Sequence, residues 1–298
     1  MIWFYTKTIT MNKKKNLYYT GKYIANVFKY SKKKINLFFL EVWTGKCCSL
    51  RCKDCVHMIP YLKPVLFDVD RLISDIEIIS QFCTVKYFSI VGGEPLTNPE
   101  LYKLVDYIGQ NPDITFCKLL TNGTIMPSQR LMESMKAAGK KFIVHVDQYP
   151  GTEETSTKIY QKIVSAGIRC IILRHSVFKE MHWKYLGGVD QKTLPEDMSQ
   201  DIYRSCGLRG CYTLADGEFT ACPRGITTEE IYDVPKNKWE NINIRKLPDN
   251  LWGRARLATS IDQGIYKDYC RNCLGITELN PLTVDAGVQL ELRDVSHE

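Results

Sequence analysis

Cys48-Ser-Leu-Arg-Cys52-Lys-Asp-Cys55 is followed, 37 residues after its last cysteine, by Gly92-Gly93-Glu94-Pro95. Three thiolates this close together can each bind one iron of a [4Fe–4S] cluster, because soft sulfur ligands suit iron. No fourth cysteine stands at a matching spacing, so one iron is left for a ligand that is not protein. The paired glycines let the backbone approach a small molecule closely, since they carry no side chain. The two motifs predict an open-iron cluster beside a small-molecule site.

This pair of motifs resembles the radical S-adenosylmethionine (SAM) enzymes, which carry Cys-x3-Cys-x2-Cys after the first barrel strand and Gly-Gly-Glu-Pro after the second. The resemblance covers roughly residues 35–285. It implies that Cys48, Cys52 and Cys55 bind the cluster and that SAM binds the open iron. It also implies cleavage of SAM to a 5′-deoxyadenosyl radical, with electrons from an external donor such as flavodoxin or ferredoxin.

This chain departs from the superfamily pattern at one residue, and one other kind of metal site is an alternative. Many members of the superfamily have an aromatic residue just before the third cysteine, where this chain has Asp54, so contact with the adenine from this position is not expected. The alternative to a cluster is a structural zinc site. A closed zinc site needs a fourth ligand, however, and it gives no reason for the later Gly-Gly-Glu.

Composition sets limits on the class of protein. With 298 residues, 44% of them hydrophobic, the chain can form one large or two modest domains. Twelve cysteines without a secretory signal favour a reducing cytosol and metal ligation over a disulfide framework. The apolar residues 1–5 are too few for a signal sequence, and no apolar run approaches the length of a membrane span. We therefore expect a cytoplasmic protein.

The N-terminal segment is strongly basic. The whole chain has a net charge of +7. Residues 1–40 contain nine lysines and no acidic residue, so the rest of the chain is slightly acidic. Such a segment can dock an anionic partner: a phosphate-bearing substrate, a nucleic acid or a membrane surface. The alternative, which we favour, is a solvated cap on the fold, and we expect no stable nucleic-acid or membrane partner. In that case the interleaved aromatic residues pack inward: Tyr18, Tyr19, Tyr23, Phe28 and Tyr30.

Strands and helices are expected to alternate after residue 34. Asn98 is expected to cap a helix that begins at Pro99, and Gly139 to end another. Repeated strand–helix units of this length imply a parallel sheet, and both motifs follow strands, where α/β barrels place their active sites. The expected strands are 35–43, 85–91, 114–120, 142–146 and 168–173, and the other expected helices are 68–82, 128–138 and 154–166.

The expected fold class is therefore α/β. The resemblance implies a partial (β/α)6 barrel with a small cysteine-rich domain after it. Five of the six units are visible in the pattern, while the sixth is not evident between His175 and Asp190. We predict a basic segment at 1–34, the barrel at 35–200 and the cysteine-rich region at 201–298.

Regular alternation stops after about residue 200, and five cysteines lie in the next part of the chain. Asp216-Gly217 predicts a hairpin between short strands. The pattern is similar to the Twitch domain, the short form of the SPASM extension, with Cys222 at the family's spacing after the hairpin glycine. The resemblance implies an auxiliary [4Fe–4S] cluster, and a zinc ribbon is the alternative for the same thiolates. The implied ligands are Cys222, Cys270, Cys273 and one of Cys206 or Cys211.

Polar residues at three strand ends are candidates for SAM binding, together with Gly92, Gly93 and Glu94. Asp147 follows the fourth strand and suits the two ribose hydroxyls of SAM, while Arg174 ends the fifth and suits its carboxylate. Asn122 occupies the corresponding place one unit earlier. An ordinary polar residue at a loop start explains each equally well. Four residues are candidates for the substrate cavity without an assigned role: His57, Tyr61, His175 and Trp183.

The segments 52–61 and 211–223 resemble radical SAM proteins of carbohydrate and surface-glycan biosynthesis, which include aminocyclitol dehydrogenases with one auxiliary cluster. This likeness implies hydrogen abstraction from a sugar, an aminocyclitol or a nucleotide-linked sugar, including anionic derivatives, with the auxiliary cluster taking an electron. Dehydration and epimerisation are alternatives to oxidation. A peptide-modifying maturase is a second hypothesis, although only about 34 residues precede the first strand. A non-catalytic iron–sulfur or zinc protein is a third, and the Gly-Gly-Glu motif argues against it.

Overall fold

One eight-stranded sheet runs through the protein, whose computed structural model describes residues 2–175 and 182–291. Its strands follow the order β5-β4-β3-β2-β1-β7-β8-β9, and all pairs from β5 to β7 are parallel. The pairs β7–β8 and β8–β9 are antiparallel. The strands are β1 Ile35–Trp43, β2 Cys83–Val91, β3 Ile114–Thr121, β4 Phe142–Gln148, β5 Cys170–Arg174, β7 Tyr212–Ala215, β8 Glu218–Thr220 and β9 Ile242–Asn243.

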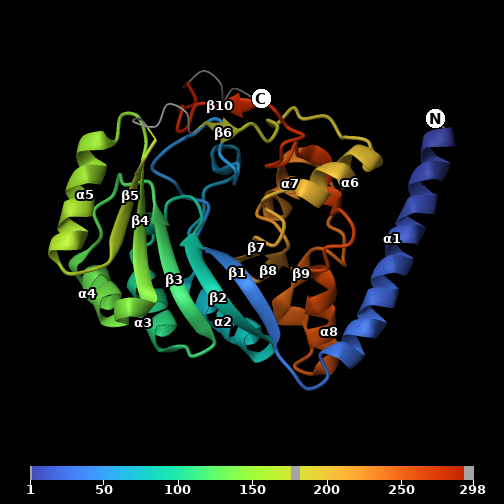
Figure 1. Ribbon diagram of the computed structural model, residues 1–298, viewed down its shortest axis with the longest axis horizontal. Helices are drawn as coiled ribbons and strands as arrows, with labels where there is room; N and C mark the ends of the chain where they lie inside the picture. The colour runs from blue at the N-terminus through green and yellow to red at the C-terminus, as the bar shows by residue number, and fades with distance from the viewer. Residues whose placement is uncertain (1, 176–181, 292–298) are drawn as a thin grey trace.

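Helices connect the first five strands and curve around the outer side of the sheet (Figure 1). Leu72, Ile76 and Ile79 of α2 are buried, as expected for the apolar face of a helix that packs on a sheet. Together with the inward residues of the strands they form the main core, which fixes the carboxyl ends of β1 to β4 relative to one another. These helices are α2 Val69–Phe82, α3 Leu101–Gln110, α4 Gln129–Ala138 and α5 Glu153–Ser165.

The predicted end of α4 is confirmed, while the predicted start of α3 is wrong. Ser128 caps α4 by accepting a hydrogen bond from the Leu131 N–H at 3.3 Å, and Gly139 ends that helix with φ 57°. The expected cap at Asn98 is wrong, because α3 begins two residues beyond Pro99 with Glu100 at its N-cap. The Asn98 amide instead donates to the carbonyl oxygens of Thr44 and Phe67, 3.3 and 2.9 Å away. Its role is to join loops on either side of the first motif.

The chain changes character after β5. Residues 176–181, in the middle of the expected sixth unit, lie outside the described residues. In the described part that follows, β6 Trp183–Lys184 does not join the main sheet but pairs antiparallel with β10 Thr283–Val284. The sixth parallel strand of the main sheet is β7, which comes after α6 Glu196–Ser205 and pairs with β1. The fold is thus the expected partial α/β barrel, extended on the β1 side by the cysteine-rich region.

The cysteine-rich region packs around the hairpin of β7 and β8. Asp216 and Gly217 both have positive φ, 43° and 80°, as a two-residue hairpin turn of the expected kind requires. The region also contains α7 Arg224–Tyr232, α8 Leu251–Ser260 and the short 3-10 helix η5 Asp268–Asn272. The other 3-10 helices are η1 Ile59–Tyr61, η2 Pro95–Thr97, η3 Gly139–Lys141 and η4 Ile244–Lys246.

The basic N-terminal segment forms the long helix α1 Ile2–Lys29, which lies against α8 (Figure 1). Its aromatic residues do not all pack inward, since Tyr19 is fully buried while Phe28 is 76% exposed. Among the described residues, no helix is both long and apolar enough to cross a membrane.

Candidate active site

A cavity of about 350 Å³ opens where β1 to β4 end, and the three cysteines of the first motif line it. The loop that carries them is held against the second motif by backbone hydrogen bonds: the Gly93 N–H donates to the Gly45 carbonyl, and the Glu94 N–H to the Cys47 carbonyl at 2.7 Å. The structure thus brings both motifs to one wall of one cavity, as the sequence predicts. The three cysteines are Cys48, Cys52 and Cys55.

The two glycines of the second motif are required by this close approach. A Cβ at Gly93 would lie 2.0 Å from the Cys47 carbonyl oxygen, and one at Gly92 would lie 2.6 Å from the Gly45 oxygen. Gly92 also has φ 138°, which other residues rarely adopt. Both glycines line the cavity, so their backbone faces any molecule bound beside the cysteines.

Replacing Gly93 by alanine is expected to weaken SAM binding between about fivefold and about 150-fold. The added methyl group forces the cysteine loop away from the second motif, and such overpacking costs about 1–3 kcal/mol. Equilibrium binding of SAM to the anaerobically reconstituted variant measures the effect. Gly21→Ala is the matched control, because a Cβ there meets no atom within 4 Å. An unchanged SAM affinity in Gly93→Ala would show that this contact does not shape the site.

Glu94 is buried, and its carboxylate is directed into the protein. It accepts hydrogen bonds from the N–H groups of Leu96 and Asn122, at 3.0 and 2.7 Å, and from the Thr121 hydroxyl at 2.8 Å. Burial raises the pKa of Glu94 to about 7, although these donors oppose the shift. Glu94 does not line the cavity, so its side chain joins the second motif to the end of β3.

The predicted polar contacts divide into two groups. Asn122 and Asp147 line the cavity, whereas Arg174 does not and stands exposed at the end of β5. The Asn122 amide lies 3.6 Å from the Cys48 sulfur, and the Asp147 Oδ1 accepts from His175 Nε2 at 3.0 Å. Asn122 and Asp147 are therefore placed for contact with a bound molecule, and the geometry gives no support to Arg174.

Of the four substrate-cavity candidates, two line the cavity and two do not. His57 and Trp183 line it. His175 lies behind Asp147 and stacks on Tyr149 with ring centroids 4.9 Å apart, while the Tyr61 hydroxyl donates to the Lys53 carbonyl. Tyr149, which follows Asp147 at the end of β4, lines the cavity itself.

A buried ion pair behind the cysteine loop was not predicted. The Glu41 carboxylate accepts from Trp43 Nε1 at 2.7 Å and lies 3.1 Å from His57 Nε2, while His57 Nδ1 faces the Gly92 carbonyl at 2.9 Å. Burial alone lowers the pKa of His57, but the Glu41 carboxylate raises it above the ordinary value. This pair ties β1 to the glycine motif. The available signal was an acidic residue within a strand that is otherwise apolar except for Asn36.

Residues from the far end of the chain also reach this site. Leu208 and Ile276 line the cavity opposite the barrel strands. The Gln289 amide donates to the Cys52 sulfur at 3.3 Å, and Lys53 and Val288 pair through their backbones at 2.8 Å. No local sequence pattern marks these contacts, because they depend on how the region after β6 packs against the barrel.

A second, smaller cavity of about 30 Å³ is lined by four of the five C-terminal cysteines: Cys206, Cys222, Cys270 and Cys273. Cys211 is not among its lining residues, and its thiol donates instead to the Glu41 Oε2 at 3.8 Å. The geometry therefore favours Cys206 over Cys211 as the fourth thiol. Leu208 lines both cavities, so the two cysteine sites are neighbours.

All the cysteines are free thiols, and burial raises the pKa of Cys55 at the first site and of Cys206 and Cys270 at the second. Burial raises the pKa of Cys48 to about 12 and that of Cys52 to about 11, and it raises the pKa of Cys222 well above the ordinary value. Such thiols stay neutral until a metal removes their protons. Among residues 2–175 and 182–291, no three His, Cys, Asp or Glu side chains are gathered closely enough for a single metal ion. The donor set of the first site fits the cluster that its motif predicts, in which each thiolate binds a different iron.

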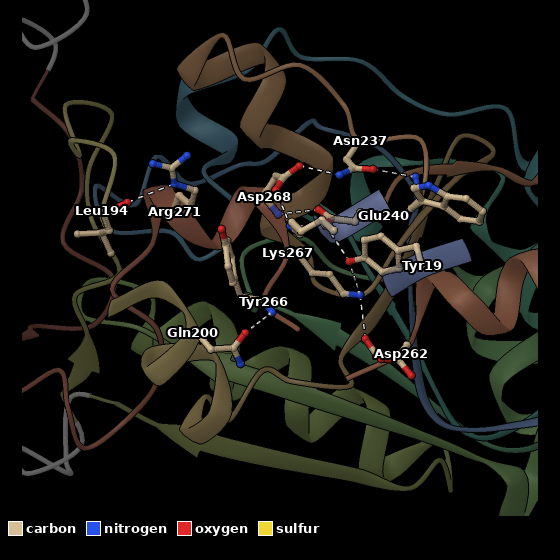
Figure 2. Close-up of polar contacts among 12 residues, drawn as sticks. Tyr19, Leu194, Gln200, Asn237, Glu240, Asp262, Tyr266, Lys267, Asp268 and Arg271 are labelled. Atoms are coloured by element: carbon tan, nitrogen blue, oxygen red, sulfur yellow. Dashed lines mark hydrogen bonds and ion pairs between the residues drawn. The ribbon is translucent and has the colours of Figure 1, made fainter. Parts of the chain in front are cut away.

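A buried polar cluster holds the segment that carries Cys270. Glu240 accepts from the Tyr19 hydroxyl at 2.8 Å and from the Asp268 N–H at 2.6 Å, and the Lys15 ammonium of α1 lies 2.7 Å from it (Figure 2). The Lys267 ammonium donates to the Asp262 carbonyl at 2.8 Å. Because these groups are buried, they fix η5 against α1, and the basic N-terminal segment is thereby part of the framework of the second site.

Comparisons with known proteins agree with this geometry. Residues 44–171 match the model of the radical SAM superfamily. The crystal structure of BtrN in complex with AdoMet and 2-DOIA aligns with a TM-score of 0.54 at 17% identity, over 87% of this chain and 98% of that one. SuiB of Streptococcus suis bound to S-adenosylmethionine aligns with a TM-score of 0.40 at 17% identity, over 54% of this chain and 39% of that one.

Among curated proteins, a GTP 3′,8-cyclase of Syntrophomonas wolfei is 29% identical over 110 residues. The match covers 35% of this chain and 32% of that protein, so the chain spans about a third of the length of this curated relative. Residues 44–171 thus form a domain of the radical SAM superfamily, in agreement with the fold and the two motifs. A domain of this superfamily implies a [4Fe–4S] cluster and SAM as its cofactors.

Proposed function

We propose that this enzyme oxidises a carbinol carbon of a sugar, an aminocyclitol or a nucleotide-linked sugar, with an auxiliary [4Fe–4S] cluster as electron acceptor. The observation that carries the proposal is the second cavity, where Cys206, Cys222, Cys270 and Cys273 meet. It adjoins the first cavity through Leu208, so an electron acceptor there lies close to a substrate held beside the first motif.

A cluster held by Cys48, Cys52 and Cys55 would supply, together with SAM, the radical chemistry that removes a hydrogen atom from the carbinol carbon. Oxidation to the carbonyl then requires the loss of one proton and one electron. Two carboxylates line the first cavity, Asp54 and Asp147, and we assign the hydroxyl proton to one of them. A cluster held by the four cysteines of the second cavity would take up the electron.

The walls of the first cavity suit a polar ring held away from water. Asn122 and Asp147 offer hydrogen-bonding groups at one side, while Leu120, Leu186 and Ile276 supply apolar surface. Lys184 also lines the cavity, although its ammonium donates to the Asn280 carbonyl at 2.7 Å. The similarity of fold to BtrN, which was crystallised with 2-DOIA, supports an aminocyclitol or sugar as the substrate class.

Anaerobic reconstitution with candidate sugars, aminocyclitols and nucleotide sugars tests the proposal, with mass spectrometry for 5′-deoxyadenosine and product. A substrate that carries one deuterium on the carbinol carbon is expected to transfer it to 5′-deoxyadenosine. The product is expected to have lost that deuterium and the hydroxyl hydrogen. A product of unchanged oxidation state would point to dehydration or epimerisation instead. Turnover of a peptide but of no sugar would favour the maturase hypothesis.

The iron content is expected to be about eight per chain, four for each [4Fe–4S] cluster. The variant with Cys48, Cys52 and Cys55 all replaced by alanine is expected to keep about four, because the second cavity does not use these residues. Iron and zinc analysis of both proteins measures this. Zinc in place of iron in the triple variant would favour the zinc-ribbon alternative and would remove the proposed electron acceptor.

A further inference from the structure

Two tyrosines that line the second cavity have buried hydroxyl groups without a hydrogen-bond partner among the described residues. Tyr203 of α6 and Tyr269 of η5 both line the cavity with the four cysteines. The two residues are only 6% and 4% exposed. Neither hydroxyl has a hydrogen-bond partner among residues 2–175 and 182–291. A buried O–H group without an acceptor is costly and uncommon in native proteins, so two in one cavity require an explanation.

The chemistry of the cavity restricts what the hydroxyls can bind. Its other lining side chains are apolar or, in Arg209 and Arg224, guanidinium groups that only donate hydrogen bonds. The remaining side chains are the four cysteines, whose sulfurs are acceptors once they carry negative charge. Acceptors for the two tyrosine hydroxyls must therefore be cysteine thiolates or atoms of a group bound in the second cavity. Sulfur or another anionic atom of such a group can accept both hydrogen bonds.

The Tyr269 ring is held in place on several sides. A Cβ at Gly225 would lie 2.7 Å from Tyr269 Cε1, so the ring packs directly on the backbone of α7. Its chain neighbours Lys267 and Asp268 are fixed by Asp262 and Glu240 in the buried polar cluster (Figure 2). The hydroxyl is thus unable to turn toward solvent without disrupting this packing.

We propose that Tyr203 and Tyr269 donate hydrogen bonds to sulfur atoms of the auxiliary cluster and thereby raise its reduction potential. The inference rests on the proposed function, because it requires a cluster in the second cavity. Reduction adds negative charge to the cluster, so donors to its sulfurs stabilise the reduced form more than the oxidised form. The two phenols would make the cluster a better acceptor for the electron of substrate oxidation. They act through the cluster and are positioning residues.

The test uses the full-length protein in which Cys48, Cys52 and Cys55 are alanine, because only the auxiliary cluster remains and its potential can be titrated alone. Tyr203→Phe and Tyr269→Phe are each expected to lower the equilibrium constant for reduction about tenfold, or about 59 mV for one electron. Tyr212→Phe is the control. That hydroxyl accepts from Gln263 Nε2 at 3.3 Å and does not line the cavity, so no shift is expected.

A second variant covers the case in which a phenylalanine variant fails to assemble the cluster. Fluorotyrosine incorporated at position 203 or 269 keeps the hydroxyl and makes it a stronger donor, so the potential is expected to rise. If the parent holds no auxiliary cluster, the proposed function fails. If the cluster is present but its potential moves no more in these variants than in Tyr212→Phe, the inference about the tyrosines fails while the proposed function stands.

Discussion

Replacing Cys48, Cys52 or Cys55 by alanine is expected to abolish the formation of 5′-deoxyadenosine. The three thiols line the same wall of the large cavity, and the resemblance to the radical SAM enzymes assigns one iron to each. No other cysteine lines that cavity, so no spare ligand is at hand when one is removed. Anaerobic incubation of each variant with SAM and a strong reductant, followed by mass spectrometry, measures the product.

Cys47→Ala is the matched control for this prediction. Cys47 is the chain neighbour of Cys48 and is similarly half-buried, yet its side chain does not line the cavity. Its backbone carbonyl, which binds the Glu94 N–H, is kept in the variant. We expect Cys47→Ala to cleave SAM at the rate of the unmodified enzyme. Full SAM cleavage by any of the three ligand variants would refute the assignment of the site.

The first five strands and the helices between them were predictable from local patterns. The strand beginning at Ile35 has the predicted bounds, and α4 ends at the predicted Gly139, because periodic apolar residues and cap chemistry act over a few residues. The position of both motifs at strand ends followed from the same units. Asn98 misled the prediction because its amide binds two loop carbonyls, which is a tertiary role that no local pattern reveals.

The partners of the candidate residues were less predictable. Asp147 is the penultimate residue of β4 and Arg174 ends β5, but only Asp147 lines the cavity. The direction of a side chain near a strand end depends on register and on the loop that follows. Leu208, Ile276 and Gln289 reach the first site from the C-terminal region, and the path of that region is set by tertiary packing. The choice between Cys206 and Cys211 likewise required coordinates, since both have plausible spacing.

The second large effect is expected for the auxiliary site. Cys222→Ala or Cys273→Ala is expected to remove the auxiliary cluster and to abolish substrate oxidation. The motifs that imply SAM binding line the other cavity, so cleavage to 5′-deoxyadenosine without product is expected to persist. This separation follows because the electron left by substrate oxidation then has no acceptor. The ratio of product to 5′-deoxyadenosine, measured in the same reaction, is the decisive quantity.

Cys206→Ala and Cys211→Ala form a matched pair within this experiment. Cys206 lines the second cavity and is expected to behave as Cys222 does, with loss of the four auxiliary irons. Cys211 is directed to Glu41, so Cys211→Ala is expected to keep those irons and to form product. If the cluster is only structural, product and 5′-deoxyadenosine will fall together in proportion to lost stability. Full product formation by a soluble variant without the second cluster would exclude both roles, because neither an electron acceptor nor a structural support would then be needed.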